Sequence, residues 1–118
     1  MKKIGGNEYV EIQVRTTTEN EIGEQIENWE TVDTLKGFLD LTTGDSKYTT
    51  YSAKIQESSH VFITDYKTLD RRIKANCSRI LRLKTGELYE ITLIDNPMEL
   101  NPHIEFYLKY TGGQNAQN

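Results

Sequence analysis

Hydrophobic and polar positions alternate along most of this chain with the period of two that is typical of a half-buried β-strand. The clearest case is residues 9–17, in which Val10, Ile12 and Val14 would face a core and the residues between them would face solvent. Further segments of strand character cover residues 29–41, 60–66, 78–84, 87–95 and 103–110, and the last of these would turn Ile104, Phe106, Leu108 and Tyr110 inward.

Turn residues separate these segments. Residues 18–28 are polar and centred on Gly23, which predicts an exposed hairpin loop. Thr85 and Gly86 predict a tight turn in which the glycine supplies the positive φ. Gly37 indicates a bulge or a bend inside the second segment, since glycine weakens a regular strand.

Short antiparallel strands joined by hairpins predict a mainly β fold in a chain of 118 residues. A closed or nearly closed barrel of about six strands, or a small sandwich, would remove the exposed strand edges. A chain of this length buries one modest core, so a single domain is expected over residues 1–113. The polar end TGGQNAQN has nothing to bury and should be disordered, which leaves residues 114–118 as a tail.

Residues 42–58 break the alternation and form an insertion of different character. Asp45 or Ser46 would cap a helix, and the apolar spacing after them is that of a narrow helical stripe: Tyr48, Tyr51, Ser52 and Ile55. A helix of one to three turns, packed weakly on one side, is therefore expected inside this insertion.

Charge is distributed unevenly along the chain. Eighteen acidic and fourteen basic residues give a net charge of −4, which argues against a general nucleic-acid binder, because phosphate neutralisation needs a basic face. Residues 1–33 hold eight acids against three bases, whereas residues 67–84 hold seven of the fourteen bases. This asymmetry fits a chain that meets copies of itself through two different surfaces, one acidic and one basic.

Targeting and disulfide signals are missing. The start MKKIGGNEYVEI has no apolar core of a signal peptide, and no run approaches the roughly 20 apolar residues of a membrane span. We therefore expect a protein without membrane contact, made in the cytoplasm and used there or in something assembled there. Cys77 is the single cysteine, so neither an internal disulfide nor a paired-cysteine metal site is expected.

The residues of catalytic chemistry do not form a recognisable constellation. His60 and His103 with Asp65 or Glu105 include metal-ligand types, but no ligand spacing supports a site. Ser59 and its neighbours Ser58, His60 and Asp65 are the residue types of a nucleophilic triad, yet they lie too close on one strand to converge. No glycine-rich phosphate loop is present. We expect no catalytic residue, no metal and no cofactor.

A nucleic-acid module of the OB type is the alternative function for a small barrel of this kind. Such modules place aromatic rings between basic residues, and Tyr66 and Tyr89 flank a basic connector over residues 67–77 that has room for one helical turn. A small barrel that binds nucleic acid or protein therefore remains the alternative.

Several runs of residues carry a resemblance to a known family: ESSHVFITDY at 57–66, Tyr89-Glu90-Ile91, IDNPM at 94–98, and HIEFYLKY at 103–110 followed by Gly112-Gly113. Over roughly residues 7–114 the chain resembles the XkdH/YqbH-type proteins of prophage head-to-tail regions. It is more distantly similar to the head-closure, or stopper, proteins of long-tailed phages.

The resemblance implies a virion structural protein assembled in the bacterial cytoplasm, a small β-barrel with a helix-bearing insertion. Such proteins form a ring, a dodecamer or a hexamer, on the portal and adaptor, join the tail proteins, and are often monomers in solution. Packaged DNA passes through the lumen. The insertion of stopper proteins projects into this channel, so the expected channel-loop residues are Asp45, Lys47, Tyr48, Tyr51 and Lys54. The expected subunit interface sets Arg71, Arg72 and Lys74 against Glu24 and Glu27 of the next copy.

Overall fold

The computed structural model of the chain describes residues 5–41, 58–95 and 103–114. These residues form six β-strands, which are β1 (Glu8–Glu19), β2 (Gln25–Leu41), β3 (His60–Asp65), β4 (Ser78–Arg82), β5 (Glu87–Asp95) and β6 (His103–Gln114). All neighbouring strands pair antiparallel. The predicted mainly β fold with about six strands is confirmed.

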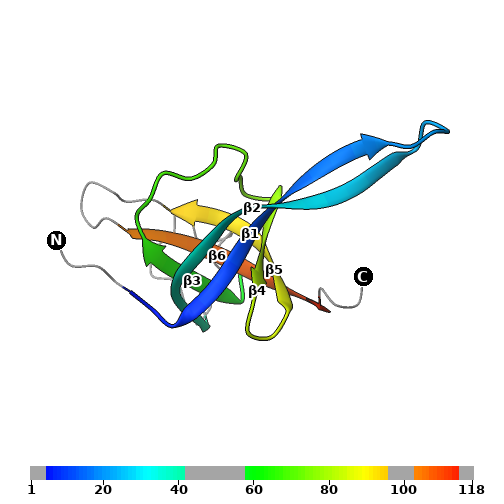
Figure 1. Ribbon diagram of the computed structural model, residues 1–118. Helices are drawn as coiled ribbons and strands as arrows, with labels where there is room; N and C mark the ends of the chain where they lie inside the picture. The colour runs from blue at the N-terminus through cyan, green and yellow to red at the C-terminus, as the bar shows by residue number, and fades with distance from the viewer. Residues whose placement is uncertain (1–4, 42–57, 96–102, 115–118) are drawn as a thin grey trace.

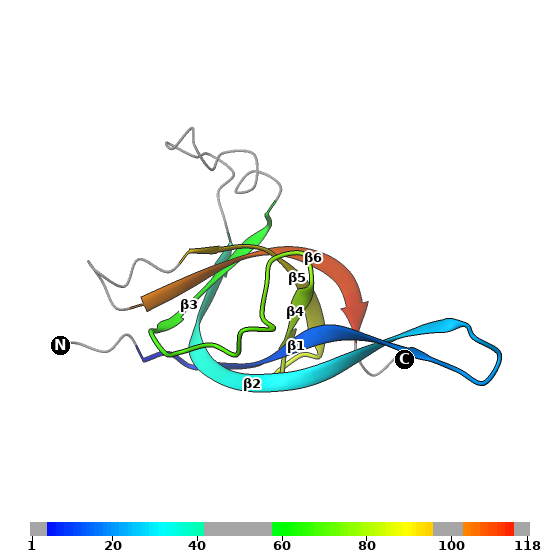
Figure 2. The same cartoon turned by 90° about the horizontal axis from the view of Figure 1, so that it is seen from above.

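The sheet closes on itself in the order β1-β2-β3-β6-β5-β4, with β4 pairing back to β1. Figure 2 looks onto this closed barrel from above. Closure satisfies the hydrogen-bonding groups of strands that would otherwise lie at an edge. The sequence was compatible with a barrel or a small sandwich, and the structure is the barrel.

Alternating side chains of all the strands fill the barrel. The predicted inward residues of β1, namely Val10, Ile12 and Val14, are buried, and so are Ile104, Phe106 and Leu108 of β6. The rings of Phe62 and Phe106, which face each other on the paired strands β3 and β6, lie 6.4 Å apart in the core. Tyr110 was expected to face inward too, but its side chain is 42% exposed at the end of the barrel, where its ring lies 5.4 Å from that of Tyr89.

A hairpin arm, residues 15–29, leaves the barrel (Figure 1). β1 pairs with β4 only from Val10 to Val14, yet it continues to pair with β2 as far as Glu19, opposite Gln25. The exposed loop predicted over residues 18–28 is therefore wrong in extent, because the connection between the strands covers only residues 20–24. Most of the arm is exposed on both faces, so its strands need no alternation of hydrophobic and polar residues. Backbone hydrogen bonds pair them, and these leave no pattern in the sequence.

The second strand bends around the barrel. Its register with β1 shifts so that Ile12 faces Asp33 and Gln13 faces Thr31, which leaves Val32 as the extra residue of a bulge. The sequence predicted a bulge or a bend at Gly37, and the bulge lies five residues earlier than that. Gly37 itself is where β2 passes from pairing with β1 to pairing with β3. A Cβ at this position would collide with the backbone carbonyl oxygen of Ile63, so only glycine allows this approach.

The connections behave partly as expected. Gly86 has φ of 80° in the β4–β5 turn and its N–H donates to the carbonyl of Arg82 over 2.7 Å, so the predicted tight turn is confirmed. The basic connector holds turns at residues 71–72 and 75–77 and no helix, because buried Ile73 fixes it to the core instead. Among the described residues there is no helix with the length and apolarity of a membrane span.

The end of the chain is ordered further than its composition indicates. β6 continues through Gln114, which pairs with Glu87 of β5, so Thr111 to Gln114 are not the disordered segment expected there. The backbone ladder with β5 accounts for the order of these polar residues. Residues 115–118, and the helix expected within residues 42–57, lie outside the described residues.

Candidate interaction site on the hairpin arm

The tip of the arm is an ordered turn held by Asn20. The side-chain Oδ1 of Asn20 accepts hydrogen bonds from the backbone N–H of Ile22, 3.1 Å, and of Glu24, 2.9 Å. Its backbone N–H donates to the carbonyl of Glu24 over 3.0 Å, and Gly23 adopts φ of 87°. This Asx-type turn fixes the conformation in which the tip presents Ile22, whose side chain is 79% exposed.

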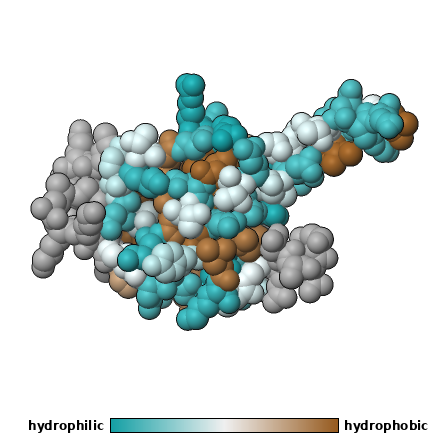
Figure 3. Space-filling model, viewed as in Figure 1, coloured by the Kyte–Doolittle hydropathy of each residue, from teal (hydrophilic) through white to brown (hydrophobic). Residues whose placement is uncertain are grey.

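The arm combines apolar and acidic surface. Ile22 and Ile26 are exposed, and four carboxylates surround them on the tip and flanks: Glu19, Glu21, Glu24 and Glu27. Figure 3 shows apolar surface at the end of the arm between hydrophilic residues. Large apolar side chains held far from the core gain nothing from the fold itself, so this end of the molecule is suited to contact another protein.

The base of the arm is anchored to the barrel by Trp29 and Arg79. The guanidinium carbon of Arg79 lies 4.1 Å from the centroid of the Trp29 ring, a cation–π contact. Arg79 Nε also donates to Oε1 of buried Gln13 over 2.7 Å. Burial lowers the pKa of Arg79, although arginine stays charged at any ordinary pH. These contacts join β1, β2 and β4 at the point where the arm begins.

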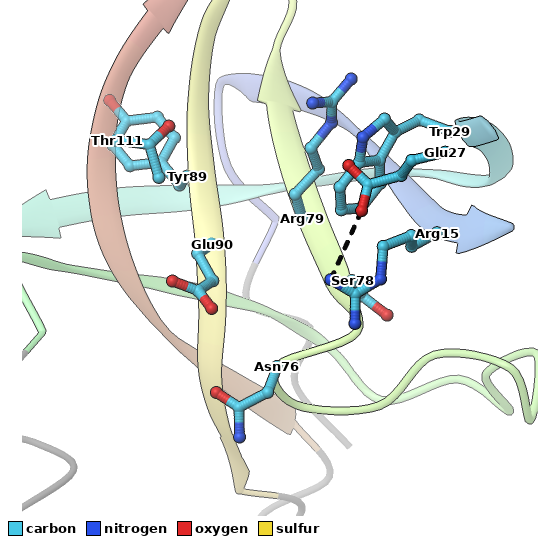
Figure 4. A pocket seen from close by; sticks show the side chains of 9 residues that line it. All are labelled: Arg15, Glu27, Trp29, Asn76, Ser78, Arg79, Tyr89, Glu90 and Thr111. Atoms are coloured by element: carbon cyan, nitrogen blue, oxygen red, sulfur yellow. Dashed lines mark ion pairs between the residues drawn. The ribbon is translucent and has the colours of Figure 1, made fainter. Parts of the chain in front are cut away.

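Beside this anchor lies an open cavity of about 310 Å³ (Figure 4). Its charged lining residues are Arg15 of β1, Glu27 of β2, Arg79 of β4 and Glu90 of β5, which Figure 4 draws as sticks. Arg15 and Glu27 form an ion pair of 3.6 Å across the arm. Two acids and two bases give the cavity no net charge with which to select a small ion.

The basic connector turns out to neutralise acids of its own chain. Arg72 donates to both carboxylate oxygens of Asp70, 3.0 and 2.9 Å, and to Glu30 of β2 over 3.3 Å. The hydrogen bonds from Arg72 hold the pKa of Asp70 at about 2 and raise that of Arg72 in turn. Lys67 forms an ion pair of 3.0 Å with Asp33. Part of the charge asymmetry read in the sequence is therefore satisfied within one molecule.

The five residues predicted for a subunit interface separate into two groups. Arg72 and Glu27 take part in ion pairs within the chain. Glu24 accepts a hydrogen bond from the side-chain amide of Asn20 at the tip, and Arg71 and Lys74 are exposed, without an ion pair among the described residues. The predicted channel-loop residues Asp45, Lys47, Tyr48, Tyr51 and Lys54 all lie outside the described residues.

A charged cluster that the sequence analysis did not identify lies at one end of the barrel. Arg82 donates to Glu8 through two nitrogens, 3.0 and 2.7 Å, and to Glu87 over 3.1 Å. These hydrogen bonds lower the pKa of Glu8 more than its burial raises it. Tyr89 donates its hydroxyl to Glu87, and burial, aided by this bond, raises the pKa of Tyr89 to about 12. The hairpin of β4 and β5 brings Arg82, Glu87 and Tyr89 together, and only barrel closure adds Glu8 of β1 to them.

The candidate catalytic and metal residues are spread along β3 and its neighbours. Ser59 Oγ lies 2.9 Å from Nδ1 of His60, but Asp65 is at the other end of the strand, where it accepts a hydrogen bond from the N–H of Gly5. Burial lowers the pKa of His60. His103 lies opposite Asp65, so the two histidines occupy opposite ends of the β3–β6 pair. Within the part of the chain that is described, no three potential metal ligands cluster.

The aromatic residues proposed for a nucleic-acid module do not form a stacking surface. Tyr89 is only 2% exposed and points into the core, whereas Tyr66 is 38% exposed. Base stacking needs an accessible ring face. The pair of tyrosines beside the connector therefore offers one ring to solvent rather than two.

Comparison with known proteins gives two findings. The family model for phage head completion proteins matches residues 1–109. Among solved structures, the solution structure of protein SF1141 from Shigella flexneri 2a, a structural genomics target, is similar with a TM-score of 0.66 and 19% sequence identity, over 97% of this chain and 100% of that chain. At this identity the likeness shows the fold alone. No curated protein matches this chain.

Proposed function

This chain belongs to the family of phage head completion proteins, and from that premise we propose that it forms the ring that closes the filled head, retains the packaged DNA and joins the tail. Membership in the family makes the chain a structural component of the phage head-tail region and of the virion. The closing ring is the finer part of the proposal. Its partners would be the portal or adaptor proteins on the head side and tail proteins on the other.

The projecting arm is the observation that carries the proposal of a ring. The molecule measures 51 × 29 × 27 Å, and the arm accounts for its elongation (Figure 1). A closed ring of identical subunits needs a surface on each copy that fits a different surface on the next. An acidic, apolar-tipped arm on a barrel with basic surface elsewhere has this property, because the arm differs in shape and charge from what it would contact.

The interface would set the acidic arm of one copy against the basic stretch of its neighbour, residues 67–84. Lys67 and Arg72 already bind acids of their own chain. The exposed bases of the stretch without an ion pair among the described residues are Arg71, Lys74 and Lys84. We therefore expect these three, rather than Arg72, to contribute charge to the contact with the acidic arm.

The insertion over residues 42–58 is proposed as the part that closes the DNA channel. Its two ends leave and re-enter the barrel side by side, because Leu41 pairs with His60 across β2 and β3. The segment between them can therefore project without interrupting the sheet. The residues assigned to the channel are Asp45, Lys47, Tyr48, Tyr51 and Lys54, and this assignment follows from the position of the insertion in stopper proteins that the sequence resembles.

Complementation of heads that lack the protein tests the proposal. DNA-filled heads assembled without this chain should lose DNA and fail to accept tails, and the added chain should restore both. A variant lacking residues 44–56 should fold and restore tail joining, but not DNA retention. Heads that keep their DNA and join tails normally without the chain would overturn the proposed function. Full DNA retention by the deletion variant would overturn only the role of the insertion.

A further inference from the structure

Two exposed apolar patches lie at opposite ends of β1. The tip patch consists of Ile22 and Ile26, which are 79% and 41% exposed. The barrel patch consists of Tyr9 and Leu83, 54% and 46% exposed, and the N–H of Leu83 donates to the carbonyl of Tyr9 over 3.1 Å. About ten residues of extended strand separate the patches, which is roughly 35 Å. Within one molecule they cannot meet.

The charges around the two patches are opposite. Glu21 and Glu24 flank the apolar residue of the tip in the sequence, and both are exposed. Lys36 lies directly opposite Tyr9 in the register of β1 and β2, and Lys84 follows Leu83; both lysines are exposed. Neither lysine forms an ion pair within the described part of the chain. Each patch is thus a pair of apolar side chains beside a pair of like charges, acidic at one end and basic at the other.

The barrel patch is also hollowed. A cavity of about 440 Å³ is lined by Asn7, Glu8, Tyr9, Leu83 and Lys84. Its one carboxylate, that of Glu8, is already bound by Arg82 over 2.7 Å, so it adds little repulsion toward an acidic partner. The hollow is large enough for an aliphatic side chain and is framed by the apolar residues that would contact it.

We propose that the arm tip of one copy docks on the barrel patch of a second copy, with Ile22 in the hollow and Glu21 and Glu24 facing Lys84 and Lys36. The inference rests on the proposed function and names its contact. A second copy is the occupant that the molecule itself specifies, because this chain carries both halves of a match in shape, apolar surface and charge. Each copy uses its tip once and its patch once, so the contact propagates from subunit to subunit as a ring requires.

The basic connector, residues 67–77, is a poorer docking site for the arm tip than the barrel patch is. It offers the charges of Arg71 and Lys74, but its aliphatic residues pack against the core: Ile73 is only 7% exposed and Leu69 is partly buried. A tip carrying Ile22 would gain electrostatic attraction there and little apolar burial. Apolar area in the middle of a contact contributes more to affinity than charges at its rim.

Cross-linking on assembled heads tests the contact directly. With Cys77→Ser as background, Ile22→Cys and Leu83→Cys are combined in one chain, bound to heads and treated with a short bis-maleimide. The expected result is a ladder of oligomers beyond the dimer that requires both cysteines. The control pair of Thr17→Cys with Leu83→Cys, which moves the reactive group down the arm, should give no ladder. Absence of the ladder from the test pair, or an equal ladder from the control pair, would overturn the proposal.

A charge exchange tests which residues meet. Lys84→Glu should weaken incorporation into heads about tenfold, the effect of losing one favourable charge contact and gaining a repulsive one. Adding Glu21→Lys to the same chain should restore incorporation, whereas Lys109→Glu, an exposed reversal on β6, should have no effect. Failure of the second change to rescue the first would contradict the pairing. If the wild-type chain is absent from heads, the proposed function fails; if it is present without the cross-link, only this inference fails.

Discussion

Arg79 lies with its guanidinium carbon 4.1 Å from the ring centroid of Trp29, and this contact ties the arm to the barrel. Trp29 is the last residue of the arm on β2, and Arg79 belongs to β4 on the far side of β1. The two side chains therefore reach across β1 and meet over its outer face, where Gln13 accepts the hydrogen bond from Arg79. Beyond this point the arm has no sheet partner other than itself.

Replacing Arg79 should loosen the arm without unfolding the barrel. Arg79→Met keeps an aliphatic stem over the ring but removes the charge and the hydrogen bond to Gln13, which should lower the local stability of the arm by about 1 kcal/mol. Amide hydrogen exchange should become faster in residues 15–19 and 25–29. Trp29 is the only tryptophan, so its fluorescence reports on the same region. Arg71→Met serves as the control, and equal exchange in both variants would contradict the anchoring role.

The Glu8–Arg82 pair should make the barrel sensitive to acid. The pKa of Glu8 is lowered from its ordinary value of 4.5 by the hydrogen bonds from Arg82. A carboxyl with a lower pKa in the folded state contributes stability that is fully present above 4.5 and is lost as the pH falls through the folded value. The free energy of unfolding should therefore fall in this window, and Glu8→Gln should flatten the dependence. Denaturation of both proteins from pH 6 to pH 2 measures the difference.

The control for this prediction is Glu21→Gln, which removes an exposed carboxylate at the tip. It should leave the acid dependence as in the wild type. If the free energy of unfolding of Glu8→Gln falls with pH as steeply as that of the wild type, the Glu8–Arg82 pair does not cause the acid sensitivity.

Gly37 should tolerate no side chain. Gly37→Ala places a methyl group against the carbonyl of Ile63 and close to the ring of Phe62, and overpacking of this kind costs about 2 kcal/mol or more. Gly86→Ala is the matched change, since that position has open space around it and only the positive φ to oppose alanine, a cost of about 1 kcal/mol. Thermal or urea unfolding should rank Gly37→Ala as the more destabilised variant. The reverse order would show that β3 can move away from β2.

Adjacent arginines of the connector should behave differently. Arg72→Glu breaks the contacts to Asp70 and Glu30 and places like charges together, so it should lower the free energy of unfolding. Arg71→Glu changes an exposed residue and should leave stability unchanged while weakening assembly on heads. Urea unfolding and a head-binding assay separate the two effects. A stability loss as large for Arg71→Glu as for Arg72→Glu would contradict this division.

Local patterns predicted the parts of the fold that pack against the core. The alternation of Val10, Ile12 and Val14 follows the period of a strand with one buried face, and the same logic identified β6 up to Leu108. The Thr85-Gly86 turn was equally local, because a positive φ selects glycine. Where side chains leave the core, as in the arm, the pattern disappears although the strands continue.

For the charge pairs, too, the sequence indicated one part and the fold decided the other. The sequence displayed an acidic region and a basic region, and opposite charges in a chain attract wherever the fold brings them together. Only the path of the connector past β2 decides that Arg72 binds Glu30 of its own molecule. The sequence alone cannot distinguish an ion pair within one chain from an ion pair between two chains, because both consist of the same residue types.

By itself the sequence determined the strand segments, the tight turn and the resemblance to head-closure proteins, because these depend on residue type and on spacing along the chain. The tertiary structure decided which strand ends meet. It placed Arg82 between Glu8 and Glu87, carried the hairpin of β1 and β2 out of the barrel, and set Tyr9 beside Leu83. The contacts of Arg82 with Glu8 and of Leu83 with Tyr9 join residues far apart in the chain, and they exist only because closing the sheet pairs β4 with β1.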